Sequence, residues 1–254
     1  MKKSRFEGSF YPDKCDELRK YFLESEKKFT EGKIRALIVP HAGYFYSGRI
    51  ADLTYSLLKK DEYKRVMVIG PSHYVYFRSL SVLLEDSYYT PCGILKSDIE
   101  YANDLIKRFN FVSYLKEVHN EHSTEVQMPF VKNYLDQKTV EVVYGDIDTD
   151  KLYEFISYLI EDKDNLIVIS TDLSHFHDLK TANKIDLNCL KSFEKLNLDL
   201  MENCEACGLK GLYAVIKVAK NNKLKSKLIS YDTSATASLD SSRVVGYMSG
   251  IVYI

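Results

Sequence analysis

Three apolar runs in this chain are each followed directly by a short polar segment that contains a histidine. The runs cover residues 36–39, 66–69 and 166–169. Each is short, apolar and rich in β-branched residues, as buried strands of a parallel sheet are. The histidines that follow are His41, His73 and His175. Because sites in open α/β sheets form beyond the carboxyl ends of the strands, this pattern predicts a metal or acid–base site at one sheet edge.

Segments of strand and helix character alternate along the chain, which is typical of a layered α/β domain. Strands are expected at 34–39, 65–69, 79–84, 139–144 and 165–170, and again within 231–254. Helices are expected around Leu18–Leu23 and at 47–59, 98–109, 121–128, 150–161, 181–193 and 198–220, the last with a break at Gly208. Pro129 is expected to end or kink the helix that starts at Glu121.

The chain contains no internal repeat, low-complexity tract or Pro/Gly/Ser-rich linker, so a single domain over residues 1–254 is expected. The last two apolar runs have no helix between them, which favours antiparallel pairing at that point. The predicted fold class is therefore α/β, with three α/β/α layers around a central mixed, largely parallel sheet.

Composition narrows the function classes. The formal net charge is −1, which gives no bulk attraction to nucleic acid or to an anionic membrane. No apolar run approaches the length of a membrane span, and the N-terminus lacks the apolar stretch of a signal peptide. The five cysteines are odd in number and irregularly spaced, which favours reduced thiols and a cytoplasmic location.

A single histidine after a strand is more often a hydrogen-bonded structural residue than a ligand. Three histidines at equivalent positions are harder to explain by unrelated structural needs. His119 and His177 do not follow a predicted strand in this way, and both are expected at the surface or behind the site.

A second polar cluster lies at residues 121–125. Glu121 and Glu125 are spaced to share one helical face, with His122 beside them. A solvated helix face is the ordinary interpretation of such a cluster. The segment at 126–130 looks buried, however, so some of these groups are expected to point into the cleft.

Cys204 and Cys207 have the spacing of half a zinc ribbon or of a redox pair. A second pair of ligands is missing, and the pair does not sit between a strand and a helix. Two small residues on one helical face are an equally good interpretation. Gly208 frees the backbone beside Cys207, so Cys207 is the stronger candidate of the two. The phosphate-loop, serine-nucleophile and His-Glu-x-x-His motifs are absent from the sequence.

Taken together, these motifs resemble one family. The segments are 38–44, 70–73, 121–125, 170–175 and 207–208, and they occur in the order seen in the Memo family. This family includes protein B of the AmmeMemoRadiSam system, and its fold is similar to that of the class III extradiol (LigB-like) dioxygenases. The resemblance begins at Phe6 and extends to the C-terminus.

The resemblance implies a metal ion held by two histidines and a cysteine. Carried over to this sequence, the ligands are His41, His73 and Cys207. His175 matches a histidine that faces the metal and is the acid–base candidate, with Asp172 beside it. A supporting role in the pocket is implied for His122, Glu125, Tyr44 and Ser72.

The cysteine changes the chemistry that the resemblance allows. Extradiol enzymes hold Fe(II) with two histidines and a carboxylate, whereas a thiolate is softer and oxidisable. Fe(II) is the first expectation for the metal here, with Cu or Zn as alternatives. Ring cleavage cannot be transferred from the fold alone.

Three functions stay open on the sequence. The first is a redox or dioxygenase-like enzyme acting on a small substrate, with aromatic compounds among the candidates. The second is a non-catalytic binding or accessory protein of the AmmeMemoRadiSam system, whose companions include a radical-SAM enzyme. The third is a thiol redox protein that works through Cys204 and Cys207, in which a disulfide between the two would eject the metal.

Overall fold

A mixed β-sheet forms the middle of the molecule in the computed structural model, which describes residues 1–22 and 28–254. Within these residues the strand order is β10-β11-β1-β8-β2-β7-β3-β6, and β9 pairs with β11. The strands are β1 (Ile34–Val39), β2 (Arg65–Pro71), β3 (Leu80–Val82), β6 (Val112–Ser113), β7 (Lys138–Tyr144), β8 (Asn165–Ser170), β9 (His175–His177), β10 (Lys225–Thr233) and β11 (Val244–Tyr253).

The centre of this sheet is parallel and its edges contain antiparallel pairs. β1 pairs parallel with β8, β8 with β2, and β2 with β7. β11 pairs antiparallel with β1, β9 and β10, and β3 pairs antiparallel with β7. The mixed sheet with a parallel centre confirms the predicted fold class.

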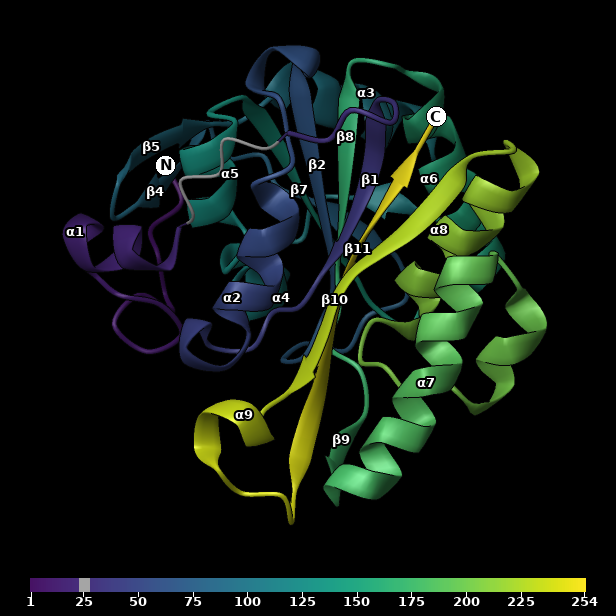
Figure 1. The fold of residues 1–254 in the computed structure, drawn as a ribbon. Helices are drawn as coiled ribbons and strands as arrows, with labels where there is room; N and C mark the ends of the chain where they lie inside the picture. The colour runs from purple at the N-terminus through teal and green to yellow at the C-terminus, as the bar shows by residue number, and fades with distance from the viewer. Residues whose placement is uncertain (23–27) are drawn as a thin grey trace.

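Helices cover both faces of the sheet and give three layers (Figure 1). One face packs against α3 (Ile99–Arg108), α6 (Thr149–Glu161), α7 (Leu179–Lys195) and α8 (Leu209–Asn221). The other packs against α2 (Tyr44–Tyr55) and α5 (Met128–Tyr134). Strand β1 shows why both faces are covered. Ala36 and Ile38 lie in the first core, whereas Leu37 and Val39 lie in the second, so side chains that alternate across the strand are apolar on both sides.

Shorter elements complete the structure. A hairpin of β4 (Ser87–Thr90) and β5 (Gly93–Lys96) lies outside the main sheet. The short helices are α1 (Cys15–Leu18), α4 (His122–Glu125) and α9 (Ala235–Ser238), and the 3₁₀ helices are η1 (Arg19–Tyr21), η2 (Lys60–Glu62), η3 (Lys116–His119) and η4 (Leu198–Asn203). The helix expected around Leu18 is therefore only α1 and η1, and Leu23 lies outside the described residues.

Two helix expectations are corrected by the structure. Pro129 does not end a helix but lies in the first turn of α5, where its missing N–H has no partner to lose. The segment from Glu121 to Leu135 is accordingly divided into α4 and α5. The expected break at Gly208 is confirmed, because Gly208 is the residue that precedes α8.

Four of the five cysteines are paired, so the expectation of reduced thiols is wrong for them. Cys15 bonds to Cys92, and Cys189 bonds to Cys204. These partners come from different elements, 77 and 15 residues apart, so their spacing in sequence does not reveal the pairing. Cys207 stays a free thiol. Since Cys204 is bonded to Cys189, it is not available to form the Cys204–Cys207 bridge of the thiol redox hypothesis.

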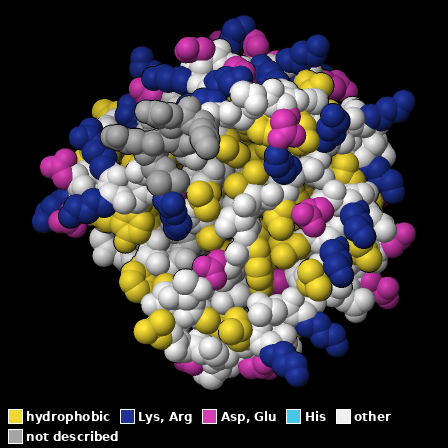
Figure 2. All heavy atoms as spheres, viewed as in Figure 1, with side chains coloured by type: hydrophobic (Ala, Val, Ile, Leu, Met, Phe, Trp, Pro, Cys, Tyr) yellow, Lys and Arg dark blue, Asp and Glu magenta, His cyan; other side chains and the backbone are white. Residues whose placement is uncertain are grey.

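The face of the molecule seen in Figure 2 carries both charged and hydrophobic side chains. Figure 2 shows Lys and Arg side chains around the edge of one face and hydrophobic side chains nearer its middle. Among the described helices, none has both the length and the apolar character needed to cross a membrane.

Candidate metal centre

The three strands that precede the histidine motifs are neighbours in the sheet. β8 lies between β1 and β2, and all three run parallel. Their carboxyl ends therefore meet at one edge. His41 follows β1, His73 follows β2, and His175 begins β9 a few residues after β8. The sequence pattern predicts His41, His73 and His175 at one sheet edge, and the order of the strands explains why His41 and His73 meet there.

Three imidazoles form a compact group at this edge. His41, His73 and His122 each offer one ring nitrogen, and these atoms lie within 4.8 Å of one another. The ring centroids are 4.4 Å apart for His73 and His122 and 5.1 Å apart for His41 and His73. His41 is 2% exposed, whereas the side chain of His73 is 29% exposed. The group thus begins in the interior and opens toward solvent.

Hydrogen bonds behind His41 fix the orientation of its ring. Its Nδ1 lies 3.0 Å from Oγ of Ser170, the last residue of β8. The side-chain amide of Gln127 donates both to Ser170 Oγ and to the carbonyl of Pro40, and its oxygen accepts from Tyr55. With Nδ1 occupied on that side, Nε2 of His41 is the nitrogen that faces the site.

Glu121 fixes His73 in the same manner. One carboxylate oxygen lies 2.9 Å from Nδ1 of His73, and the other accepts from the His73 backbone N–H at 2.6 Å. Glu121 is fully buried and also accepts from the Ser123 N–H at the start of α4. A carboxylate behind an imidazole is the usual support of a metal-ligating histidine, because it fixes the ring and raises its basicity. The sequence pattern places Glu121 in a polar cluster but does not predict that it supports His73.

His122 was expected only in a supporting role, and the structure places it in the imidazole group itself. Its Nδ1 lies 3.0 Å from Glu121 Oε1, but this buried nitrogen makes no hydrogen bond within the described part of the chain. The rings of Phe6 and Phe10 lie against His122, at 5.8 and 4.8 Å between centroids. The N-terminal segment therefore forms one wall of the group.

Cys207 reaches the group from the loop before α8. Its Sγ lies 3.1 Å from Nε2 of His41, which is the nitrogen that faces the site. The backbone N–H of Asp172 points at the same sulfur at 3.2 Å, and the Cys207 N–H donates to the Asp172 carbonyl. Cys207 is thus in contact with His41, although it is not one of the three side chains whose donor atoms all lie within 4.8 Å.

Two glycines allow the backbone to approach this closely. A Cβ on Gly70 would lie 2.5 Å from Ser123 Oγ, so α4 packs on the end of β2 only because that position lacks a side chain. A Cβ on Gly208 would lie 2.6 Å from Cβ of Thr171. Cys207 and His122 therefore reach the site through glycine contacts with the sheet.

Asp172 and His175 lie near the three imidazoles but are not part of that group. Oδ1 of Asp172 accepts from the His41 N–H at 2.7 Å, so the carboxylate holds the His41 loop. Burial raises the pKa of Asp172, although the N–H groups of His41 and Ala42 oppose the rise. His175 is half-buried, and it is near enough to affect the pKa of both Asp172 and His41. It does not belong to the group of three imidazoles.

The other expected pocket residues hold the structure around the site. Glu125 Oε1 accepts from the N–H groups of Arg5 and Phe6 and from the Tyr11 hydroxyl. Tyr44 donates to the Val126 carbonyl at 2.7 Å, and Ser72 donates to the Val75 carbonyl at 2.8 Å. Ser72 also lines the cleft described next.

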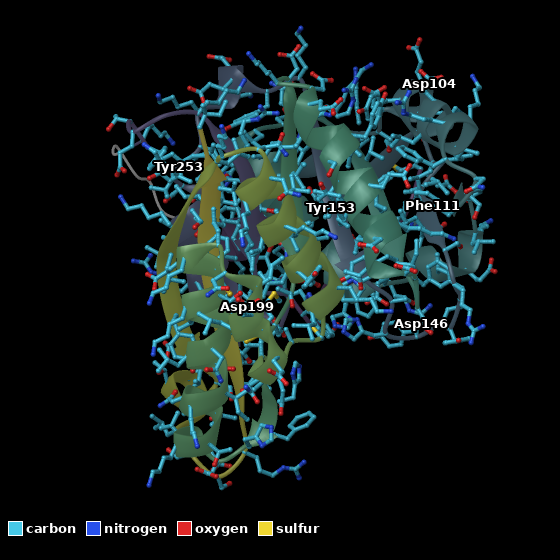
Figure 3. The ribbon with its side chains drawn as sticks, turned by 90° about the vertical axis from the view of Figure 1, so that its right-hand side faces the viewer. Asp104, Phe111, Asp146, Tyr153, Asp199 and Tyr253 are labelled. Atoms are coloured by element: carbon cyan, nitrogen blue, oxygen red, sulfur yellow. A yellow bond between two sulfur atoms is a disulfide. The ribbon has the colours of Figure 1, made fainter. Side chains whose placement is uncertain are left out.

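A cleft of about 590 Å³ opens beside the group. His73 and Cys207 line it at one side, and Asp146, labelled in Figure 3, lines it at another. Tyr144 is also part of its lining, and its hydroxyl is buried without a hydrogen-bond partner among the described residues. The cleft gives a small molecule a route to the two side chains.

Without a bound cation, the surroundings of the site favour the neutral forms of His41 and Cys207. Burial, together with the neighbouring His73 and His122, lowers the pKa of His41, which keeps it a neutral imidazole. Burial and the charge of Asp172 raise the pKa of Cys207 to about 12. Burial alone would raise the pKa of Glu121, but the imidazoles beside it outweigh that effect and lower the pKa.

The remaining histidines lie apart from this group. His177 is partly exposed and lies 2.8 Å from a Glu205 carboxylate oxygen. His119 is buried rather than at the surface, between Ser81 and Glu141. The position of His119 was hard to predict because Glu141 is a charged residue within the buried strand β7.

Comparisons with known proteins agree with the motifs. Residues 2–251 match the family model described as Memo-like protein. A MEMO1 family protein of Methanobrevibacter smithii is 34% identical over 282 residues and covers 99% of both chains. A MEMO1 family protein of Aquifex aeolicus is 30% identical over 265 residues and covers 97% of both.

A solved structure supports the fold. It is a crystal structure of an Escherichia coli K12 protein described as uncharacterized, with a TM-score of 0.55 and 12% sequence identity. The match covers 85% of this chain and 99% of that one. At this identity the likeness concerns the fold alone. On the family match and the two relatives, the chain belongs to the Memo-like protein family.

Proposed function

We propose that this protein binds a redox-active metal ion, Fe(II) first, at His41, His73 and Cys207, with His122 as a further donor. The observation that carries the proposal is the convergence of donor atoms: three imidazole nitrogens lie within 4.8 Å of one another, and the Cys207 sulfur lies 3.1 Å from His41 Nε2. These four side chains come from four separate segments of the chain. A histidine with only a structural role does not require three other potential metal ligands beside it.

The donor set fits a metal in its chemistry and its supports. The ring nitrogens of His41, His73 and His122 lie within 4.8 Å of one another and would hold the ion together with the Cys207 sulfur. His41 and His73 each have the rear nitrogen occupied, by Ser170 and Glu121. Nδ1 of His122 is buried, lies 3.0 Å from Glu121 Oε1 and makes no hydrogen bond in the described part of the chain. Imidazole and thiolate together suit Fe, Cu and Zn.

The same contacts suggest a role for each residue around the proposed metal ion. A bound metal of this kind would supply open coordination positions and, for Fe or Cu, electron transfer. The cleft beside His73 and Cys207 would admit a small substrate. His175, half-buried at the same edge, would exchange a proton with it, and Asp172 would hold the His41 loop in place during turnover.

Metal content tests this proposal directly. Protein purified without oxygen is expected to contain about one metal per chain, and His41→Ala or Cys207→Ser is expected to lose it. Added Co(II) gives a second readout, because a cobalt–thiolate absorption band should appear in the wild type and be missing in Cys207→Ser. Absence of any bound metal, with no uptake of Fe(II), Cu(I) or Zn(II), would overturn the proposal.

A second candidate is an accessory protein that uses the same pocket without turnover, alongside AmmeMemoRadiSam companions such as a radical-SAM enzyme. The exposed rings of Tyr74 and Tyr76 at the cleft favour this alternative, since large aromatic side chains at a surface suit contact with a partner. His175→Ala separates the two: it should abolish turnover in an enzyme and leave an accessory function intact.

A further inference from the structure

The loop that carries Cys207 is held by a disulfide. Cys204, three residues before Cys207, is bonded to Cys189 of α7. Cys189 is fully buried and Cys204 is 6% exposed. The helix η4, marked by Asp199 in Figure 3, packs beside α7 and leads into this loop.

Other contacts hold the same loop on both sides of the disulfide. Asn188 of α7 donates to the Asn203 carbonyl at 3.2 Å. Glu205 lies 2.8 Å from His177, at the end of the strand that begins with His175. Cys207 itself is bonded through its backbone to Asp172. The disulfide is the covalent member of this set, and it ties the loop to α7 at the point where the loop leaves η4.

The disulfide is reached from the surface. Cys204 lines a cleft of about 670 Å³ that is separate in its lining residues from the cleft beside His73. Lys184, Glu202 and Glu205 line the same cleft, so its charges do not attract a thiolate and access depends on the opening itself. A small dithiol that entered this cleft would meet Cys204 without passing through the cleft beside His73.

We propose that Cys189–Cys204 is a thiol–disulfide exchange site that controls the position of Cys207, and through it the retention of metal. This rests on the proposed role of Cys207 as a ligand. A dithiol reductant attacks Cys204 Sγ, the Cys189–Cys204 bond breaks, and Cys189 leaves as a thiolate that takes up a proton. The second thiol then displaces Cys204, so the protein gains two electrons and two protons and the reductant becomes a cyclic disulfide.

The released loop should then move more freely. The disulfide joins two residues that are 15 positions apart in the sequence. From the loop-closure entropy of such a bond, its reduction would raise the equilibrium constant for local opening of the loop by at most roughly a hundredfold. The neighbouring hydrogen bonds remain, so a smaller effect is expected. Cys189 and Cys204 are positioning residues in this proposal.

The test uses the alkylation of Cys207, which is the free thiol of the oxidised chain. Metal-stripped wild type, Cys189→Ala/Cys204→Ala and the control Cys15→Ala/Cys92→Ala are treated with iodoacetamide, and the Cys207 peptide is followed by mass spectrometry. The control removes the other disulfide, which ties α1 to the β4–β5 hairpin. We expect alkylation about tenfold faster in the first variant and within twofold of wild type in the control.

Equal rates in all three proteins would overturn the proposal, as would finding Cys189 and Cys204 unbridged in oxidised wild type. If the first variant does not fold, hydrogen exchange in wild type with and without dithiothreitol decides. Faster exchange confined to residues 203–208 supports the proposal, and unchanged exchange there contradicts it. Neither alkylation nor hydrogen exchange requires a bound metal. If the wild type proved to bind no metal, the proposed function would be contradicted, but both measurements would still test the disulfide.

Discussion

The Sγ atom of Cys207 lies 3.1 Å from Nε2 of His41, across a separation of 166 residues. The contact exists because the loop before α8 folds back over the ends of β1 and β8, where Asp172 binds the backbone of both His41 and Cys207. Asp172 is therefore a link between two candidate ligands. This arrangement places a cysteine sulfur, rather than a carboxylate, against the open nitrogen of His41.

His122 should matter for metal affinity, although sequence resemblance gives it only a supporting role. Its ring belongs to the group of three imidazoles, whereas that of His175 at the same edge does not. We expect His122→Ala to weaken Co(II) binding at least tenfold and His175→Ala to leave it unchanged. Titration followed by calorimetry measures both. Equal affinities for His122→Ala and wild type would show that His122 is not a donor.

Glu121 should act through His73. Replacing it with Gln weakens the acceptor behind Nδ1, and loss of such support typically costs 10–100-fold in metal affinity. Glu121→Gln is therefore expected to bind Co(II) roughly tenfold or more weakly. Glu125→Gln is the control, because Glu125 binds the N-terminal backbone instead. It should lower the melting temperature and change metal affinity little; the reverse pattern would contradict the assignment.

A buried charge pair joins the N-terminus to the sheet and should make stability sensitive to acid. Burial alone would raise the pKa of Glu141, but Lys2 and His119 outweigh it and lower the pKa to about 2 from an ordinary 4.5. A depressed carboxylate pKa stabilises the fold fully above pH 4.5, and this stabilisation, about 3 kcal/mol, is lost as the pH falls toward 2. Denaturant unfolding across that range measures it.

Lys2→Met separates this pair from other acid-sensitive groups. Lys2 lies 3.0 Å from a Glu141 oxygen, and its removal leaves a buried carboxylate without its cation. We expect a loss of about 3 kcal/mol at pH 7 and a shallower acid dependence between pH 4.5 and 2. Lys3→Met, at an exposed neighbouring position, should change neither. Identical behaviour of the two variants would refute the role of the pair.

Much of the fold could be predicted because its central strands are apolar on both faces. The runs before His41 and His73 are such strands. They lie on either side of β8 and run parallel to it, so their carboxyl ends bring the two histidines to one edge. The family resemblance added Cys207. Short elements were harder: β9 has three residues, and its Phe176 has a positive φ of 65°, which apolar periodicity does not indicate.

The remaining parts of the site depend on long-range packing. Glu121 supports His73 from 48 residues away, through a short helix whose approach depends on Gly70. The Cys189–Cys204 bond likewise depends on how α7 lies against η4. In both cases the sequence contains the reactive groups, but only the packed structure shows which of them meet.

The buried Tyr144 hydroxyl is expected to lower the free energy of unfolding, because it makes no hydrogen bond in the described chain. It is buried beside the cleft without a hydrogen-bond partner in the described chain, whereas the equally buried Tyr44 hydroxyl donates to the Val126 carbonyl at 2.7 Å. An unpaired buried hydroxyl carries a desolvation penalty of about 1–3 kcal/mol. Tyr144→Phe should therefore leave the free energy of unfolding unchanged or higher, while Tyr44→Phe should lower it by about 1 kcal/mol. If Tyr144→Phe is the more damaging change, the hydroxyl has a partner in solution, and a water or ligand held in the cleft becomes the explanation to test.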